Sequence, residues 1–151
     1  MPARVRPAVA AAVLAVVTVA VVAGVAGAGG SGGTNPGSTG TVKTVVLTAR
    51  HSRFEPARIN VAVGTTVRFV VRNLDPIDHE LIVGDDATHR HHETGRDGHH
   101  QGNVPGEISV PAGTTAVTTY TATTPGDIVF ACHVAGHFAY GMAGTLAVSR
   151  K

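Results

Sequence analysis

The sequence contains a single cysteine among its 151 residues. One cysteine excludes a disulfide within the chain, so Cys132 needs a different explanation. No strong excess of charge is present either: twelve Lys and Arg stand against ten Asp and Glu, and Arg4 and Arg6 lie before the first apolar run. Nucleic-acid binding requires a clustered basic face. We therefore expect no nucleic-acid partner.

Residues 1–28 predict an export segment. Two arginines precede an apolar run over residues 8–23, and Ala26-Gly27-Ala28 matches an A-x-A cleavage site. The run is longer than the usual signal core of roughly 7–15 residues. Two alternatives therefore stay open: a cleaved signal peptide, or a membrane anchor formed by residues 8–28. Both place the remaining chain outside the cytoplasm, in the periplasm or at the cell surface.

Sustained helical periodicity is also lacking after this segment. Residues 29–40, GGSGGTNPGSTG, read as a Gly/Ser-rich linker. Residues 41–151 form short segments in which apolar and polar residues alternate, and this pattern predicts an all-β domain of seven or eight strands in two sheets. The later strands are expected near 79–84, 107–110, 115–122, 127–132 and 143–149.

One long insertion interrupts these strands. Residues 85–101, DDATHRHHETGRDGHHQ, include no apolar residue larger than alanine, so we expect a mobile surface loop. Five of the nine histidines lie in it, and clustered imidazoles bind Cu(II), Zn(II) or Ni(II). These candidate secondary metal ligands are His89, His91, His92, His99 and His100. The alternative is a solvated loop that binds metal only adventitiously.

A set of nitrogen and sulfur donors flanks this insertion. The set comprises two imidazoles, a thiolate and a thioether, from His79, Cys132, His137 and Met142. Thiolate and thioether favour Cu(I), whereas imidazole accepts both oxidation states, so the combination suits a copper ion that cycles between Cu(I) and Cu(II). The alternatives are a buried core cysteine, a histidine that only fills a sheet position, and a methionine that only packs.

Strand phase favours the metal hypothesis. Cys132 is in phase with Phe130, and His79 is in phase with Leu81, so both donors point to the face of core residues. His133 has the opposite phase and is expected, like His51, on the surface. Small residues after the cysteine allow the chain to fold back and bring His137 and Met142 to the thiolate. They are Ala135, Gly136, Ala139 and Gly141.

With these motifs the sequence resembles the cupredoxins, the blue-copper family that includes plastocyanin and azurin. The resemblance covers nearly all of residues 41–151, from Phe54-Glu-Pro56 to the closing segment 144–148. It implies a Greek-key β-sandwich that holds one type 1 copper at one end. In plastocyanin and azurin an Asn follows the upstream ligand histidine and braces the copper loop, whereas Glu80 stands here. We expect Glu80 and Asn73 to lie beside the ligands and to influence the reduction potential.

The resemblance implies one-electron transfer as the usual activity. The leading hypothesis is a monomeric electron carrier that exchanges electrons with a redox partner protein or a membrane respiratory component. The alternative is copper capture, buffering or resistance outside the cytoplasm, with the histidine-rich insertion collecting ions. We expect no enzyme, because four protein ligands leave no position for a substrate.

Overall fold

The computed structural model describes residues 40–94 and 100–150; the predicted export segment and residues 29–39 of the linker lie outside them. In the described part of the chain no helix is long and apolar enough to cross a membrane. That part contains nine strands and one helix. They are β1 (Val42–Arg50), β2 (Arg53–Glu55), β3 (Arg58–Ala62), β4 (Thr66–Asn73), β5 (His79–Gly84), α1 (Asp86–Glu93), β6 (Glu107–Val110), β7 (Thr115–Thr121), β8 (Gly126–Ala131) and β9 (Ala143–Ser149).

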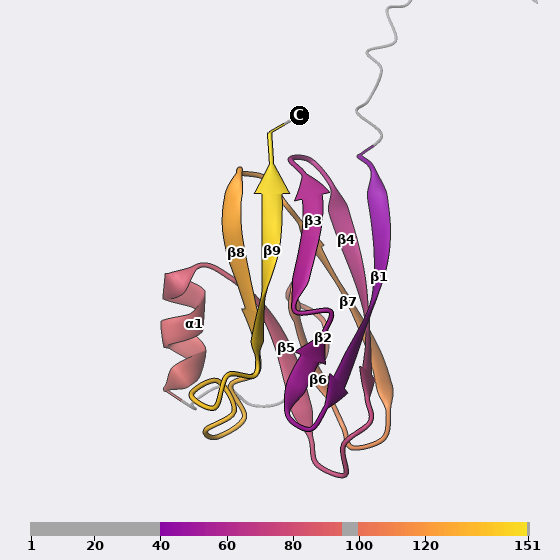
Figure 1. Cartoon of the computed structure of the whole chain (residues 1–151), viewed down its shortest axis with the longest axis vertical. Coiled ribbons are helices and arrows are strands. Elements are labelled where there is room, and N and C mark those ends of the chain that lie inside the picture. The colour runs from indigo at the N-terminus through magenta and orange to yellow at the C-terminus, as the bar shows by residue number, and fades with distance from the viewer. Residues whose placement is uncertain (1–39, 95–99, 151) are drawn as a thin grey trace, which may run out of the picture. The chain divides into compact units, whose positions relative to one another are not determined.

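The strands form two sheets that face each other (Figure 1). One sheet has the order β2-β1-β4-β7 and the other β3-β9-β8-β5-β6. The pairs β1–β4 and β3–β9 are parallel, and the remaining pairs are antiparallel. The predicted β-sandwich is confirmed. The ninth strand is β2, whose three residues are too few to show an alternating pattern.

Alternation along the strands builds the core between the sheets. In β4, Phe69 is fully buried, while Arg68 and Arg72 on the opposite face are exposed. Phe130 of β8 is also fully buried, and its ring meets Phe54 edge to face at a centroid distance of 5.8 Å. Burying one such side chain contributes roughly 1.5–3 kcal/mol. The apolar sequence pattern therefore fixes which face of each strand turns inward.

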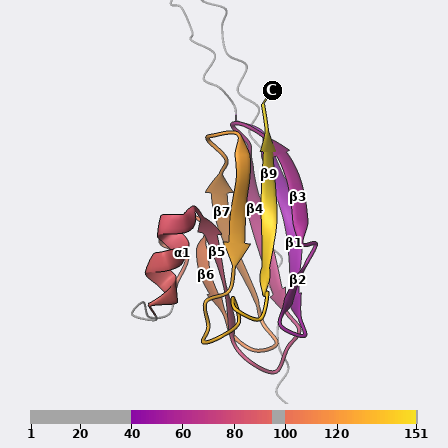
Figure 2. The same cartoon turned by 60° about the vertical axis from the view of Figure 1, so that its left-hand side comes forward.

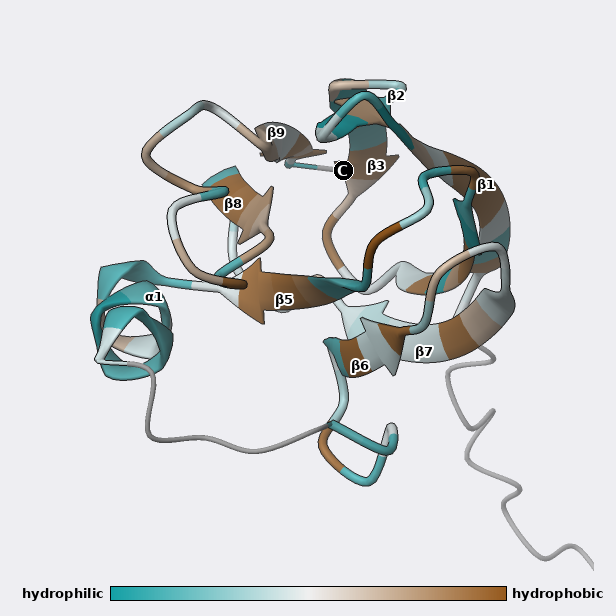
Figure 3. Cartoon of the chain, turned by 90° about the horizontal axis from the view of Figure 1, so that it is seen from below, coloured by the Kyte–Doolittle hydropathy of each residue, from teal (hydrophilic) through white to brown (hydrophobic). Residues whose placement is uncertain are grey.

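The predicted mobile loop is wrong for residues 86–93, which form α1 beside β5 (Figures 2 and 3). Asp85 caps this helix by accepting a hydrogen bond from Thr88 N, and three basic residues occupy its last turn. His89 and His92 are buried although the helix is hydrophilic. The helix is therefore held by capping and by histidine packing, neither of which an apolar-residue pattern reveals.

Three connections converge at the lower end of the sandwich in Figure 1. The β1–β2 turn contacts the β4–β5 connection, because the backbone N–H of His51 donates to Asp75 Oδ1 at 2.7 Å. The β8–β9 loop contacts the start of β5, where Cys132 Sγ lies 3.8 Å from His79 Nδ1. The candidate metal ligands are thus collected at one end of the β-sandwich.

Candidate metal centre

Three of the four predicted ligands present their donor atoms to one another. His79 Nδ1 and His137 Nδ1 lie 3.2 Å apart, and Cys132 Sγ lies 3.4 Å from His137 Nδ1 and 3.8 Å from His79 Nδ1. Donors bonded at about 2.0–2.3 Å to one first-row metal ion stand about 3.3–3.7 Å apart. The three atoms therefore have the spacing of donors that share one ion, and they form one of the metal-ligand groups in the described residues.

The fourth predicted ligand is joined to the two loop ligands through its backbone. Met142 is fully buried in the core with Cys132. Its backbone N–H donates to His137 O at 2.9 Å, and its carbonyl accepts from Cys132 N at 3.1 Å. These two bonds tie Met142 to both loop ligands.

Glycine lets the loop between β8 and β9 turn tightly enough. Gly136 and Gly141 have φ of +85° and +84°, a left-handed conformation that other residues adopt at a cost. A hydrogen bond from Gly141 N to Phe138 O closes the second turn. As a result, His137 returns to Cys132 only five residues after it. The expected role of the small residues is supported at both glycines.

A buried carboxylate orients the first ligand. His79 Nε2–H donates to Asp75 Oδ2 at 2.8 Å, which leaves the lone pair of the neutral imidazole on Nδ1, facing Cys132 and His137. Burial by itself raises the pKa of Asp75, but hydrogen bonds from Ser52 N, His79 and His51 N outweigh it and lower that pKa. Asp75 therefore stays ionised beside the ligand.

Sequence reasoning missed Asp75. Its only signal is a carboxylate four residues before a ligand histidine, and that spacing is common in loops. Asn73 was predicted beside the site, and it holds this connection: its Oδ1 accepts from Asp75 N at 2.9 Å and its Nδ2 donates to Val110 O at 3.0 Å. Asn73 thus acts on the ligands through Asp75.

Glu80 stands at the predicted bracing position and contacts the cysteine and its neighbour. Its N–H points at Cys132 Sγ at 3.5 Å, and its Oε1 accepts from His133 N at 2.8 Å. Burial raises the pKa of the Cys132 thiol to about 11, against the smaller lowering effect of the N–H groups of Glu80 and Val134. Copper must therefore displace a proton from this sulfur when it binds.

The donor set fits copper. A free, fully buried thiol and two imidazole nitrogens lie within 3.8 Å of one another. Burial, followed by His79, lowers the pKa of His137, so this imidazole is neutral and available as a ligand at neutral pH. Thiolate with imidazole suits a copper ion that changes between Cu(I) and Cu(II).

The remaining histidines fall into different surroundings. His51 is exposed, as predicted, and His99 lies outside the described residues. The prediction of a surface His133 is wrong: its Nε2 lies 2.9 Å from His89 Nδ1, because α1 covers the face of β8 that strand phase assigns to solvent. Burial, and then His89 and His92, lower the pKa of His133 to about 4. None of these histidines joins the three-donor cluster.

A β-sandwich with a buried His₂Cys cluster and an adjacent methionine at one end is the architecture of a type 1 copper protein. The comparison with family models agrees. Residues 41–149 match the model described as copper binding proteins, plastocyanin/azurin family, and the chain belongs to this family. Its cofactor is copper, and His79, Cys132, His137 and Met142 are the residues that would hold it as a type 1 site.

Two curated relatives share more specific similarity. The copper-resistant cuproprotein CopI of Rubrivivax gelatinosus is 39% identical over 98 residues, which cover 64% of this chain and 59% of the relative. The protein of the same name from Pseudomonas aeruginosa is 31% identical over 126 residues, covering 63% and 70%. The chain thus spans less than two thirds of the first relative.

Solved structures support the fold. Auracyanin A, a blue copper protein from Chloroflexus aurantiacus, superposes with a TM-score of 0.59 at 22% identity, covering 72% of this chain and 99% of its own. Reduced auracyanin from Roseiflexus castenholzii gives 0.57 at 19% identity, covering 73% and 99%. At such identities the likeness establishes the shared architecture only.

Proposed function

We propose that this protein serves in copper resistance outside the cytoplasm, and that its type 1 site binds copper and exchanges one electron at a time. The observation that carries the redox part is the convergence of His79 Nδ1, Cys132 Sγ and His137 Nδ1 within a buried cluster. The role in resistance is supported by two relatives that are both named copper-resistant cuproproteins.

Copper at this site would supply the change between Cu(I) and Cu(II). The protein supplies a fixed set of donors: Asp75 holds the His79 ring by its Nε2–H, and Glu80 N–H contacts the sulfur. A site whose ligands are held in this way needs little rearrangement between oxidation states. His137 is the least buried of the three donors, so we propose that electrons enter and leave beside it. The exposed Tyr140 belongs to the same loop and is part of the proposed contact surface for a redox partner.

A dedicated electron carrier between respiratory partners is the second candidate function. It is favoured by the closed donor set, which offers no position for a substrate and therefore no catalytic turnover. The two functions differ in what the cell loses without the protein. A carrier is required for respiratory electron flow at ordinary copper, whereas a resistance protein is required only in excess copper.

Copper loading followed by visible and EPR spectroscopy tests the redox site. We expect an intense thiolate-to-Cu(II) charge-transfer band that is absent from Cys132→Ser, while a colourless Cu(II) form of the unsubstituted protein would refute the assignment. Growth tests the function: a strain that lacks the protein should lose tolerance to excess copper. Complementation with Cys132→Ser should fail, and with His51→Gln it should succeed. Unchanged copper tolerance combined with defective respiration would favour the carrier instead.

A further inference from the structure

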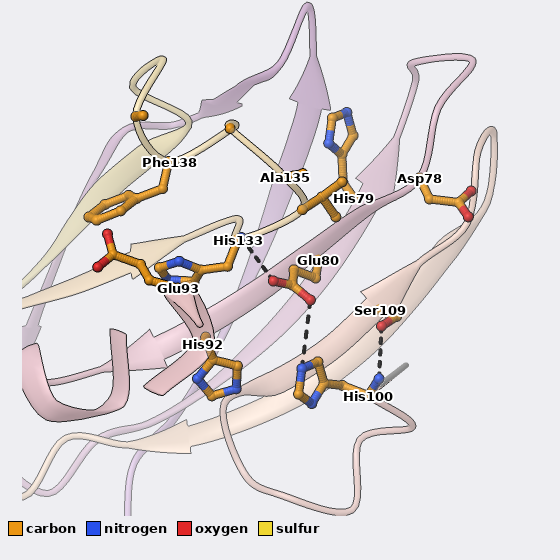
Figure 4. A pocket seen from close by; sticks show the side chains of 13 residues that line it. Asp78, His79, Glu80, His92, Glu93, His100, Ser109, His133, Ala135 and Phe138 are labelled. Carbon is orange, nitrogen blue, oxygen red and sulfur yellow. Dashed lines mark hydrogen bonds and ion pairs between the residues drawn. The ribbon is translucent and has the colours of Figure 1, made fainter. Parts of the chain in front are cut away.

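A second cluster of metal-binding side chains lies beside the copper site. It borders a pocket of about 610 Å³ lined by residues of α1, β5, β6 and the β8–β9 loop (Figure 4). His92, His100 and Glu107 each offer one donor atom, and these atoms lie within 4.8 Å of one another. His92 and His100 come from the histidine-rich insertion, whereas Glu107 belongs to β6 and was not among the predicted ligands.

The distances from Glu107 to the two histidines match those between ligands of one ion. His100 Nδ1 lies 3.2 Å from Glu107 Oε2, and His92 Nε2 lies 3.6 Å from the same oxygen. Nitrogen and oxygen ligands of a tetrahedral first-row ion at about 2.0–2.2 Å stand about 3.3–3.5 Å apart. All three side chains are largely buried, with relative exposures of 5%, 13% and 16% for His92, His100 and Glu107. The group is therefore not a set of histidines scattered on the surface.

Hydrogen bonds hold the imidazole of His92 and the backbone of His100 in place. His92 Nδ1–H donates to Thr88 O at 2.9 Å, so in the neutral ring the lone pair lies on Nε2, the nitrogen that faces Glu107. The backbone of His100 is fixed to β6, because its N–H donates to Ser109 Oγ at 2.8 Å and its carbonyl accepts from Ser109 N at 2.8 Å. The lone pair of His92 Nε2 and the carboxylate of Glu107 repel each other unless a proton or a cation lies between them.

A neighbouring ring also leaves a nitrogen unsatisfied. His89 Nε2–H donates to Val129 O, so His89 Nδ1 accepts from His133 Nε2–H. The lone pair of His133 therefore lies on Nδ1, which is buried and has no hydrogen-bond partner within the described residues. His133 lines the same pocket, and its ring centroid lies 5.9 Å from that of His92. One imidazole lone pair of a residue that lines the pocket thus has no donor within the described residues.

We propose that His92, His100 and Glu107 form a second metal site for a late first-row divalent cation, with Cu(II) bound more tightly than Zn(II). Imidazole suits both ions, and the Irving–Williams order places Cu(II) above Zn(II). The carboxylate of Glu80, whose Oε2 lies 3.6 Å from His100 Nε2, adds negative charge beside the site. This site goes beyond the proposed function, since neither resistance nor electron transfer at the type 1 centre requires a second ion.

Glu80 connects the two sites. Its Oε2 faces His100, its Oε1 accepts from His133 N, and its backbone N–H points at Cys132 Sγ. A cation at the second site attracts this carboxylate and alters the hydrogen bonding around the thiolate. Occupation of the second site is therefore expected to shift the charge-transfer band of the first.

The test titrates the protein, with one copper already in the type 1 site, with Cu(II) supplied as its glycine complex. We expect a second equivalent with an EPR signal distinct from the first, a small shift of the visible band, and displacement by Zn(II) only at higher concentration. His100→Gln and the isosteric Glu107→Gln should weaken this second equivalent at least tenfold. His91→Gln, an exposed histidine of the same helix outside the cluster, is the matched control and should bind as the unsubstituted protein does.

Each other outcome has a distinct meaning. If the copper-loaded protein takes up no second ion, the contacts of His100 with Glu80 and Glu107 explain the cluster without a metal, and the proposal is overturned. Equal binding by Glu107→Gln and His91→Gln would also overturn it. Retention of the visible band shows that each variant is folded. If the visible band is absent but Cu(II) still binds at His92, His100 and Glu107, the proposed type 1 function is refuted and the second metal site is supported.

Discussion

Replacing Asp75 by asparagine is expected to raise the reduction potential of the copper site. The ionised carboxylate lies 2.8 Å from Nε2 of His79, and its side chain is only 8% exposed. Oxidation adds one positive charge at the metal, about 5–7 Å from this carboxylate once the His79 ring and a metal–nitrogen bond of about 2.0 Å are added to the hydrogen bond. At an effective dielectric constant of about 20 the attraction is about 2–3 kcal/mol. Asparagine removes it, and the potential should rise by about 100 mV.

Spectroelectrochemical titration of the copper-loaded protein measures this shift. Asp78→Asn is the matched control, because it removes the same charge from an exposed residue whose carboxylate accepts from Ala112 N and points away from His79 (Figure 4). Solvent screens that charge, so the control should move the potential by less than about 20 mV. A fall in potential, or equal shifts in both variants, would refute the assigned role of Asp75. A thermal melt shows whether the Asp75→Asn variant is still folded, since the substitution also affects the hydrogen bonds from His51 N and Ser52 N to Asp75.

Three further outcomes are expected. Because the pKa of Cys132 is about 11 in the metal-free protein, copper binding near pH 8 should release about one proton, and affinity should rise about tenfold per pH unit below pH 11; a pH-indicator assay without proton release would contradict this. Phe130→Ala should lower the free energy of unfolding by about 3–5 kcal/mol in urea titration, since the ring is fully buried. Folding lowers the pKa of His133 to about 4, so between pH 6.5 and 4 the unfolded chain binds a proton on this residue more readily than the folded protein does. The metal-free protein should therefore lose stability as pH falls from about 6.5 to 4, and His133→Gln should flatten that dependence in urea midpoints.

The strands and the three-donor cluster could be predicted because their signals are local. The expected segments 79–84, 107–110 and 143–149 coincide with β5, β6 and β9. Side chains alternate across a strand with a period of two, so the phase of His79 and Cys132 against their core neighbours was readable without a fold. The five-residue spacing from Cys132 to His137, with Gly136 between them, likewise predicts a tight turn that returns the histidine to the cysteine.

The helix and the surroundings of His133 could not be predicted in the same way. The hydrophobic pattern of residues 86–93 indicates no helix, because the buried side chains are histidines that pack against other polar rings. Strand phase placed His133 on the outer face correctly, but only the position of α1 decides that this face is covered. A residue pattern cannot show which element covers a sheet when that element is hydrophilic.

The single cysteine and its spacing to His137 and Met142 were enough to indicate a copper-binding β-sandwich. The chemistry of soft donors and the alternation of strands are both properties of the chain itself. The tertiary structure alone decided which groups act on those donors. Asp75 reaches His79 because a turn 23 residues earlier supplies its N–H partners, and Glu80 faces His100 because β5 and β6 pair. Such contacts depend on how distant segments meet, and they set the electrostatics of the site.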